Sequence, residues 1–454
     1  MPGMTADTMG SVDPTPEAAV IGLRTSRLVS NRWVWIGAAC AMLASTPLGD
    51  DRVGRADPRG DDPQNASSDE VTTSPADEAP GVTATEIKIG QLMPYSGPAS
   101  PYGVIGKTEA AYFKSVNDQG GINGRKIHLI SLDDGYIPPK AVAQTRKLVE
   151  DEGVAFLFNS VGTANNTAVW KYLNDRGIPQ LFVATGADQW ADPEHHPWTM
   201  GWQPSYRTEA KIYAKYLMKA KPPAKLCVLY QNDHFGKEYL QGLRDGLGDH
   251  HDKVVVMRLS YEVTDPEADP QIEALRQAGC NTLLVAATPK FAAQTIRKVA
   301  DLRWKPLLLV SNVSVSIPSV LKLAGLDKST GIITGVYLKD PSDPALARDA
   351  EMNEYRAWAK EYLSPDVDLN DLLAVYGYAA GASLVQVLTA CGNDLSRASI
   401  MKHAASLQHA TTPLLIKGIE INTSATDYRP IQQMKLRRFN GTRFELFGSV
   451  LNDD

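Results

Sequence analysis

The chain has 454 residues, a length that allows two or three domains with full hydrophobic cores. Hydrophobic residues make up 43% and charged residues 22% of the sequence, which is ordinary for a globular protein. The formal net charge is −6, and the basic pair Arg437–Arg438 does not extend into a larger cluster. Because nucleic acid is bound by concentrated Lys and Arg, no nucleic-acid partner is expected.

The N-terminal part of the chain has the pattern of a secretory signal. Arginines at 24, 27 and 32 precede the short apolar stretch WVWIGAACAMLAS at 33–45. The stretch is marginal for a membrane span, which needs about 20 apolar residues. We therefore assign 1–49 to an export signal region and expect the protein in the periplasm. The segment GAAC offers a lipid anchor at Cys40 as the alternative.

Residues 50–85 are rich in Asp, Pro, Ser and Gly and contain almost no large apolar residues. Such a segment cannot bury enough surface to fold, so a disordered linker is expected. Cys227 and Cys280 border or enter expected strands, and no cysteine has a partner at metal-ligand spacing. Both are expected to be buried, unpaired thiols. The adjacent His195 and His196 are expected on the surface, and no metal site is expected.

From residue 86 onward, short apolar runs alternate with amphipathic stretches. Strands are expected at 87–93, 126–133, 154–158 and 178–184 and, after a Trp-rich break, at 225–230, 253–259, 281–287 and 306–310. Helices are expected between them at 103–118, 138–151, 164–176, 204–220, 236–247, 269–278 and 289–301. This alternation is typical of parallel sheets flanked by helices, and two series predict an α/β protein with two lobes.

Small or neutral polar residues follow many of the expected strands. They lie in NSVGTANNTAV (159–169), VATGADQW (183–190), YQNDHFG (230–236), AATPK (286–290) and VSNVSVS (310–316). In one stretch alone, helix capping explains such residues, since their oxygens accept hydrogen bonds from the free N–H groups of a helix start. Ligands of open α/β sheets bind at the carboxyl ends of strands. The repetition therefore favours a cleft that binds an anion through backbone N–H groups and hydroxyls.

Several motifs occur in the order found in one protein family. They are P-x-S-G-P (94–98), N-x-x-GGINGRK (117–126), RGIP (176–179), LKLAG (321–325) and YGYAAGASL (376–384). Over about 86–450 the chain resembles the branched-chain amino acid-type (Leu/Ile/Val-binding) periplasmic binding proteins. These proteins are the solute receptors of one class of ABC importers.

The resemblance implies a type I periplasmic binding protein with two Rossmann-like lobes. Three crossing segments join the lobes, which close like a hinge on a ligand. Lobe 1 is expected at 86–203 plus 337–410, and lobe 2 at 204–336 plus 411–454. The protein is expected to be a monomer that has no cofactor and works with a membrane-embedded ABC permease.

Carried over position by position, the resemblance implies a ligand carboxylate at Thr163, a contact loop after the next strand, and aromatic cleft walls. The implied binding residues are Tyr102, Val161, Gly162, Thr163, Ala184, Thr185, Gly186, Phe235, Thr288 and Asn312. Trp190 is a further candidate for a wall, with packing near the hinge as the alternative for the Trp-rich stretch. The loop disulfide of some relatives is absent, because its sites fall near Tyr136 and on Gly162.

The chain departs from the family where amino-acid-binding members hold the ligand ammonium with an acidic residue. SNVSVS (311–316) stands there with Asn312, and Thr288 replaces a helping aromatic residue. Burying an ammonium without a counter-charge costs several kcal/mol. We therefore expect an aromatic or otherwise apolar carboxylic acid as the ligand. An amide, a peptide-like acid or an amino acid is the alternative, and for an amino acid Asp233 is the expected counter-charge.

Two other classes of function are alternatives to a solute receptor. An enzyme with a nucleotide cofactor is not expected, because no G-x-G-x-x-G follows the first strand and no P-loop or G-x-S-x-G occurs. A ligand-sensing regulator of the same fold remains an alternative. Such a cytoplasmic sensor would lack an export signal, so the segment 24–45 distinguishes the two.

Overall fold

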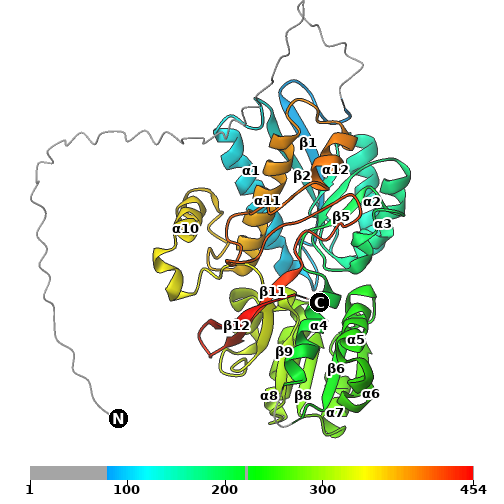
Figure 1. Ribbon diagram of the computed structural model, residues 1–454, viewed down its shortest axis with the longest axis vertical. Helices are drawn as coiled ribbons and strands as arrows, with labels where there is room; N and C mark the ends of the chain where they lie inside the picture. Colours follow the sequence, from blue (N-terminus) through cyan, green and yellow to red (C-terminus); the bar gives the residue numbers. More distant parts are fainter. Residues whose placement is uncertain (1–78, 220–222, 453–454) are drawn as a thin grey trace, which may run out of the picture. The chain divides into compact units, whose positions relative to one another are not determined.

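The computed structural model describes residues 79–219 and 223–452 (Figure 1). The expected signal region, Cys40 and residues 50–78 of the expected linker lie outside the described residues. The end of that linker is described and was wrongly predicted. Val82 is buried, and the carbonyl of Gly81 accepts a hydrogen bond of 2.7 Å from the N–H of Lys88. Residues 79–85 therefore pack against the first strand.

The first sheet consists of five parallel strands in the order β2-β1-β3-β4-β5. The strands are β1 (Glu86–Met93), β2 (Lys126–Asp133), β3 (Leu157–Phe158), β4 (Gln180–Val183) and β5 (Thr199–Gly201). The helices associated with this sheet are α1 (Gly103–Asp118), α2 (Pro138–Arg146), α3 (Thr163–Asp175), α11 (Leu372–Ala390) and α12 (Arg397–Ala404) (Figure 1). Helices α1 and α2 start within the predicted stretches, because their apolar residues recur at helical spacing.

The second sheet has the order β12-β11-β10-β9-β8-β6-β7, and its last two strands along the chain are antiparallel. Its strands are β6 (Leu226–Gln231), β7 (Val255–Tyr261), β8 (Thr282–Ala286), β9 (Leu307–Val310), β10 (Ile333–Val336), β11 (Gln433–Phe439) and β12 (Phe444–Asn452). The helices that follow or precede them are α4 (Tyr206–Leu217), α5 (His234–Leu247), α6 (His251–Val254), α7 (Asp269–Gln277), α8 (Pro289–Asp301) and α9 (Lys322–Ala324), with α10 (Ala350–Tyr362) further on. Two sets of α/β elements, each with a mainly parallel sheet, are thus present, which is the architecture that the resemblance implies.

The chain passes between the two sets of elements three times: after β5, after β10 and between α12 and β11. The second and third crossings pair with each other, since the N–H of Lys339 donates to the carbonyl of Leu414 at 2.7 Å. The first crossing lies beside the second, where the rings of Trp202 and Tyr337 have centroids 6.0 Å apart. Three adjacent segments therefore connect the lobes.

Within the expected second-lobe range 411–454, the two halves make different contacts. The hydroxyl of Thr412 donates to the carbonyl of Ala379 in α11, and Tyr428 donates to the carbonyl of Pro197. Strands β11 and β12 instead extend the second sheet beside β10. Residues before β11 thus contact elements of the first sheet.

Helix α11 is a core helix. Among the described residues it is the one helix long and apolar enough to cross a membrane, but 67% of its apolar window is buried in the protein. Glycines in the motif YGYAAGASL allow it to approach α1. A Cβ on Gly377 would lie 2.8 Å from the carbonyl oxygen of Ile105, and one on Gly381 would lie 2.8 Å from the ring of Tyr112.

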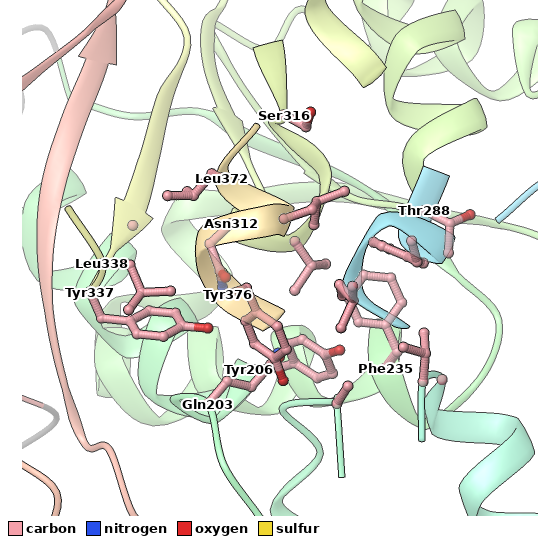
Figure 2. A pocket seen from close by; sticks show the side chains of 18 of the residues that line it. Gln203, Tyr206, Phe235, Thr288, Asn312, Ser316, Tyr337, Leu338, Leu372 and Tyr376 are labelled. Carbon is pink, nitrogen blue, oxygen red and sulfur yellow. The ribbon is translucent and has the colours of Figure 1, made fainter. Parts of the chain in front are cut away.

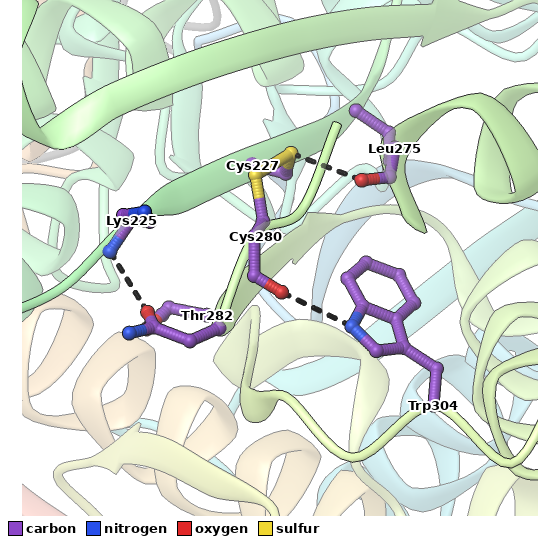
Figure 3. Close-up of a disulfide and its surroundings, with 7 residues drawn as sticks. Lys225, Cys227, Leu275, Cys280, Thr282 and Trp304 are labelled. Carbon is purple, nitrogen blue, oxygen red and sulfur yellow. Dashed lines mark hydrogen bonds between the residues drawn. A yellow bond between two sulfur atoms is a disulfide. The ribbon is translucent and has the colours of Figure 1, made fainter. Parts of the chain in front are cut away.

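Cys227 and Cys280 form a disulfide, with Cα atoms 5.8 Å apart (Figure 3). The prediction that both are unpaired thiols is therefore wrong. Cys227 lies in β6 and Cys280 shortly before β8, and these two strands are hydrogen-bonded neighbours although β7 separates them along the chain. That neighbourhood depends on the strand order, which the spacing of the cysteines does not reveal. Cys391 is a buried free thiol.

Candidate ligand-binding site

A cavity of about 60 Å³ lies where loops at the carboxyl ends of strands from both sheets meet (Figure 2). Most of the binding residues implied by the sequence line it: Tyr102, Val161, Gly162, Ala184, Phe235, Thr288 and Asn312. Thr163, Thr185 and Gly186 do not line it. No charged side chain is among the described residues that form its wall, and most wall residues are aromatic or aliphatic.

Local structure explains how the strand ends deliver these residues. Val161 and Ala184 follow β3 and β4 and form a single parallel bridge, which holds the two loops together. Phe235 lies in the first turn of α5, and Thr288 immediately precedes α8. Asn312 begins the 3₁₀ helix Asn312–Ser314, directly after β9 and Ser311.

Five aromatic or amide residues of the wall were missed by the sequence analysis: Tyr136, Gln203, Tyr206, Tyr337 and Tyr376. Gln203 and Tyr337 lie in crossing segments, where no strand-end pattern marks them. Tyr376 lies inside the motif YGYAAGASL, which was used only to identify the family. Tyr136 has a φ of 62°, and such strained backbone is enriched at functional sites.

Tyr136 packs directly on Gly162. A Cβ on Gly162 would lie 2.6 Å from the Cε2 atom of the Tyr136 ring, and the glycine has a φ of 103°. Only glycine fits this position without strain. Tyr136 and Gly162 thus lie in contact at the place where some relatives carry a loop disulfide.

The polar side chains of 159–169 are mostly bonded to the protein. Asn165 donates to the carboxyl of Asp134, and Asn166 donates to the carbonyls of Ser160 and Gly162. None of them caps helix α3, which has no side-chain cap. Among the described residues, no acceptor is found for the backbone N–H groups of the first residues of α3, 163–165. The start of this helix thus offers free donors next to Gly162, which lines the cavity.

The hydroxyl of Thr163 is 2.5 Å from the hydroxyl of Thr185, which lies 3.3 Å from the hydroxyl of Tyr206. Both threonines are 1% exposed, whereas Tyr206 lines the cavity. Gln203 supplies another polar group to the wall. It is 8% exposed, and its Nε2 has no hydrogen-bond partner among the described residues.

Trp190 does not form a wall of this cavity, so that prediction is wrong. Its side chain is buried and packs edge-on against Trp170, with ring centroids 5.6 Å apart, in a cluster with Val183 and Ala187. The 3₁₀ helix Asp188–Ala191 places the indole there. Thr185, Gly186 and Trp190 instead line a separate cavity of about 20 Å³.

His195 is exposed and contacts Asp192, whereas His196 stacks on Trp170 at 3.8 Å. In the part of the chain that the structure describes, no group of three or more His, Cys, Asp or Glu is placed to hold a metal ion.

A buried carboxyl that the sequence analysis missed lies behind Asn312. Glu209 is 0% exposed and accepts hydrogen bonds from the hydroxyls of Tyr213 and Tyr239. It also accepts from both the backbone N–H and the side-chain amide of Asn312. Burial raises the pKa of Glu209, while these donors oppose that shift.

Asp233, the expected counter-charge for an amino acid, does not line the cavity. Its carboxyl caps helix α5 by accepting from the N–H of Gly236 at 3.3 Å, and it also accepts from Gln231 at 2.6 Å. Burial raises its pKa.

Several contacts join the lobes near the cavity, among them a hydrogen bond of 2.9 Å from the hydroxyl of Ser316 to the carboxyl of Asp371. The backbone N–H of Asp188, after β4, donates to both carboxyl oxygens of Glu238 in α5, at 2.9 and 2.8 Å. The hydroxyls of Tyr102 and Ser314 lie 3.3 Å apart. Burial raises the pKa of Glu238 to about 8, with Asp188 adding to the shift. These contacts hold the two lobes against each other.

The fold and the site define a protein that encloses a small ligand between two α/β lobes. A family described as periplasmic binding protein matches residues 86–443, and the chain belongs to this family. Among curated relatives, Leu/Ile/Val-binding protein homolog 1 of Brucella abortus is 26% identical over 324 residues. The match covers 69% of this chain and 81% of that protein.

Solved structures share the fold. One is a branched chain amino acid ABC transporter from Thermus thermophilus with bound valine, at a TM-score of 0.73 and 15% identity, covering 82% of this chain and 97% of that one. Another is a solute binding protein of an ABC transporter from R. palustris in complex with benzoate. It has a TM-score of 0.68 and 22% identity and covers 81% of this chain and 98% of that one.

Proposed function

We propose that this protein is the extracytoplasmic receptor of an ABC importer and that it closes on a small, largely apolar carboxylic acid. The observation that carries this proposal is the cavity between the lobes, which has aromatic and aliphatic walls and no charged side chain among the described residues. A ligand that fits such walls is mainly apolar, with its polar end held by a few neutral groups.

The polar end of the ligand is proposed to be a carboxylate because the neutral groups include unpaired donors. The free N–H groups at the start of α3 and the buried Nε2 of Gln203 have no acceptor among the described residues. Hydrogen bonds to a charged acceptor are stronger than neutral ones, and a helix N-terminus favours negative charge. Within this proposal, Thr163, Thr185 and Gly186 support the carboxylate site from behind the wall.

Independent observations support a periplasmic location. Relatives in the same family are periplasmic, and the sequence of 33–45 has the pattern of an export signal. The Cys227–Cys280 disulfide supports the same location, since disulfides persist in oxidising compartments such as the periplasm. We propose that the protein acts there as a monomer that delivers its ligand to a membrane-embedded permease.

An α-amino acid is the second candidate, and one observation favours it. Glu209 places a carboxyl behind Asn312, where amino-acid-binding relatives need a counter-charge. Its oxygens already accept hydrogen bonds from protein donors, however, and it does not line the cavity. The deaminated acid therefore stays the first candidate.

A thermal-shift screen tests the proposal. The panel contains benzoate, 3-phenylpropanoate, 4-methylpentanoate, their amides, and the amino acids phenylalanine and leucine. A ligand at 100 times its Kd adds about 2.7 kcal/mol of stability, which raises the melting temperature measurably. Stabilisation by the acids but not by their amides supports a carboxylate ligand. Stabilisation only by the amino acids or only by the amides contradicts it.

A further inference from the structure

We infer that Glu209 fixes the amide of Asn312 so that the ligand meets a hydrogen-bond acceptor, and that the ligand is a carboxylic acid with a neutral donor, such as a hydroxyl, close to its carboxylate. This inference rests on the proposed function, because it assigns a second polar group to the same acid. Glu209 acts through Asn312 and is therefore a positioning residue.

The orientation of the Asn312 amide follows from the chemistry of its neighbour. The backbone N–H of Asn312 donates to Oε1 of Glu209 at 2.9 Å, and this bond places the side-chain amide next to Oε2. The four hydrogen bonds that Glu209 accepts favour its ionised form, and a carboxylate oxygen accepts but does not donate. The NH₂ end of the amide must therefore face Glu209, and Oδ1 must be the end that points away.

Glu209 is itself held on the side away from Asn312. The hydroxyls of Tyr213 and Tyr239 both bond to its carboxyl, and Tyr213 also accepts the N–H of Gly335. Tyr239 is further bonded to the hydroxyl of Ser311 at 2.6 Å. All these side chains are buried, so the carboxyl cannot turn without breaking several hydrogen bonds.

The free end of the Asn312 amide is available to a ligand. Asn312 lines the cavity and is half-buried, and among the described residues Oδ1 has no hydrogen-bond partner. Glu209 does not line the cavity. It lies behind the backbone of Gly335, where a Cβ would be 3.4 Å from Oε1. The ligand thus meets an acceptor without a free charge, which suits a hydroxyl better than an ammonium.

The size of the cavity limits how far the donor lies from the carboxylate. The cavity of about 60 Å³ favours a small, compact acid. An acid of this size has few carbon atoms between its polar groups. A 2-hydroxy acid with a short apolar side chain meets both the acceptor and the aliphatic wall.

The test compares acids that share one carbon skeleton. Titration calorimetry of the mature protein is carried out with 4-methylpentanoate, 2-hydroxy-4-methylpentanoate, 2-oxo-4-methylpentanoate and leucine. The hydroxy acid is expected to bind up to about tenfold more tightly than the unsubstituted acid, the factor for one added neutral hydrogen bond. The oxo acid, whose oxygen only accepts, is expected to bind more weakly than both.

Glu209→Gln is expected to remove the advantage of the hydroxy acid over the oxo acid, because a hydroxyl and a carbonyl oxygen both accept from an NH₂ group. In this variant the amide oxygen of the new side chain still accepts the backbone N–H of Asn312, so its NH₂ group takes the place of Oε2 and donates to Oδ1 of Asn312. The Asn312 amide then turns its NH₂ end to the cavity, and the oxo acid gains on the hydroxy acid. The matched control is Glu109→Gln, a buried carboxyl that bonds to Gln91 and does not contact Asn312. It should keep the original order.

A second variant covers the case in which Glu209→Gln does not fold. Asn312→Ala removes the acceptor, so the advantage of the hydroxy acid should disappear while 4-methylpentanoate still binds. Equal binding of the hydroxy and unsubstituted acids to the unaltered protein overturns the inference but leaves the proposed function intact. If none of the three acids binds but benzoate or 3-phenylpropanoate does, the inference is overturned and the proposed function stands; if no acid binds at all, both fail. Binding of leucine alone overturns both.

Discussion

Three hydroxyl groups form a hydrogen-bonded chain near the carboxyl ends of the strands of the first sheet. Only one of the three residues lines the cavity. Thr163 bonds to Thr185, and Thr185 bonds to Tyr206, at 2.5 and 3.3 Å. The threonines are 1% exposed, so only Tyr206 touches the cavity. We infer that Tyr206 contacts the ligand and that the threonines orient its hydroxyl.

Tyr206→Phe and Thr163→Val separate these two roles. Tyr206→Phe should weaken binding of the preferred acid by about tenfold, the factor for a hydrogen bond to a charged group. It should lower stability less than Thr163→Val does, because Thr185 keeps its shorter bond to Thr163. Thr163→Val leaves the buried hydroxyl of Thr185 without one partner. It should lower the free energy of unfolding by about 1–2 kcal/mol and change the affinity less. Urea denaturation and calorimetry measure both quantities, and a larger affinity loss in Thr163→Val would place its hydroxyl on the ligand.

Glu238 makes stability depend on pH. Its pKa is raised from 4.5 to about 8 by burial, next to Asp188, Arg207 and Asp233. The folded protein therefore holds this proton more tightly than the unfolded chain does. Stability is unaffected by this group below about pH 4.5 and falls as the pH rises from there to about 8. A shift of this size corresponds to a few kcal/mol at most.

Glu238→Gln should flatten this dependence. Urea denaturation at pH 5 and pH 8 should show a smaller loss of stability for the variant than for the unaltered protein. Other buried acids contribute to the slope in both proteins, so the difference between the two isolates Glu238. Equal slopes would show that the carboxyl is ionised without penalty in the folded protein.

At the scale of the elements, the amphipathic helices were predicted closely and the shortest strands were not. Helix α8 spans Pro289–Asp301, the predicted range, because its buried residues recur on one face. Strands β5 and β10 have three and four residues and were missed. The stretch 154–158 is buried throughout, yet only Leu157–Phe158 pairs as β3. Burial of an apolar stretch therefore does not determine at which residue the pairing of a strand begins.

The candidate site was predicted where it follows strand ends and missed where it depends on packing. Phe235 and Asn312 follow strands and were found. Gln203 and Tyr337 lie in crossing segments, and Glu209 lies on a helix face that looks like an ordinary surface pattern. These residues reach the site only because separate segments cross side by side, which no local pattern encodes.

Helix α11 offers a test of close helix packing. Gly377→Ala should lower the free energy of unfolding by about 1–3 kcal/mol, the cost of overpacking, because its new Cβ would meet the carbonyl oxygen of Ile105 at 2.8 Å. Gly381→Ala is the matched comparison. Its Cβ would meet the ring of Tyr112, a side chain that can move, so the loss should be smaller. An equal loss of unfolding free energy in both variants would mean that the backbone of α1 moves aside as readily as the side chain of Tyr112 does.

At the scale of the whole molecule, the disulfide ties neighbouring strands of the second sheet. It joins cysteines separated by 53 residues, and closing a loop of this length is worth about 4 kcal/mol in the chain-entropy treatment. Replacing both cysteines with serine should lower the urea midpoint accordingly, and so should reduction. Binding of the ligand should persist in the folded fraction, because neither cysteine lines the cavity. Unchanged stability after reduction would contradict the assignment.

Tyr337 and Leu338 belong to a crossing segment and also form part of the cavity wall. Part of the wall that contacts the ligand therefore belongs to the segments that connect the two lobes. An acid that is too long for the cavity can still place its carboxylate at the start of α3, but the rest of the molecule keeps the two lobes apart. Such a molecule would occupy the receptor without presenting the closed form to a permease. Longer homologues of the natural ligand are thus expected to act as competitive inhibitors of uptake, with affinity and transport no longer rising together.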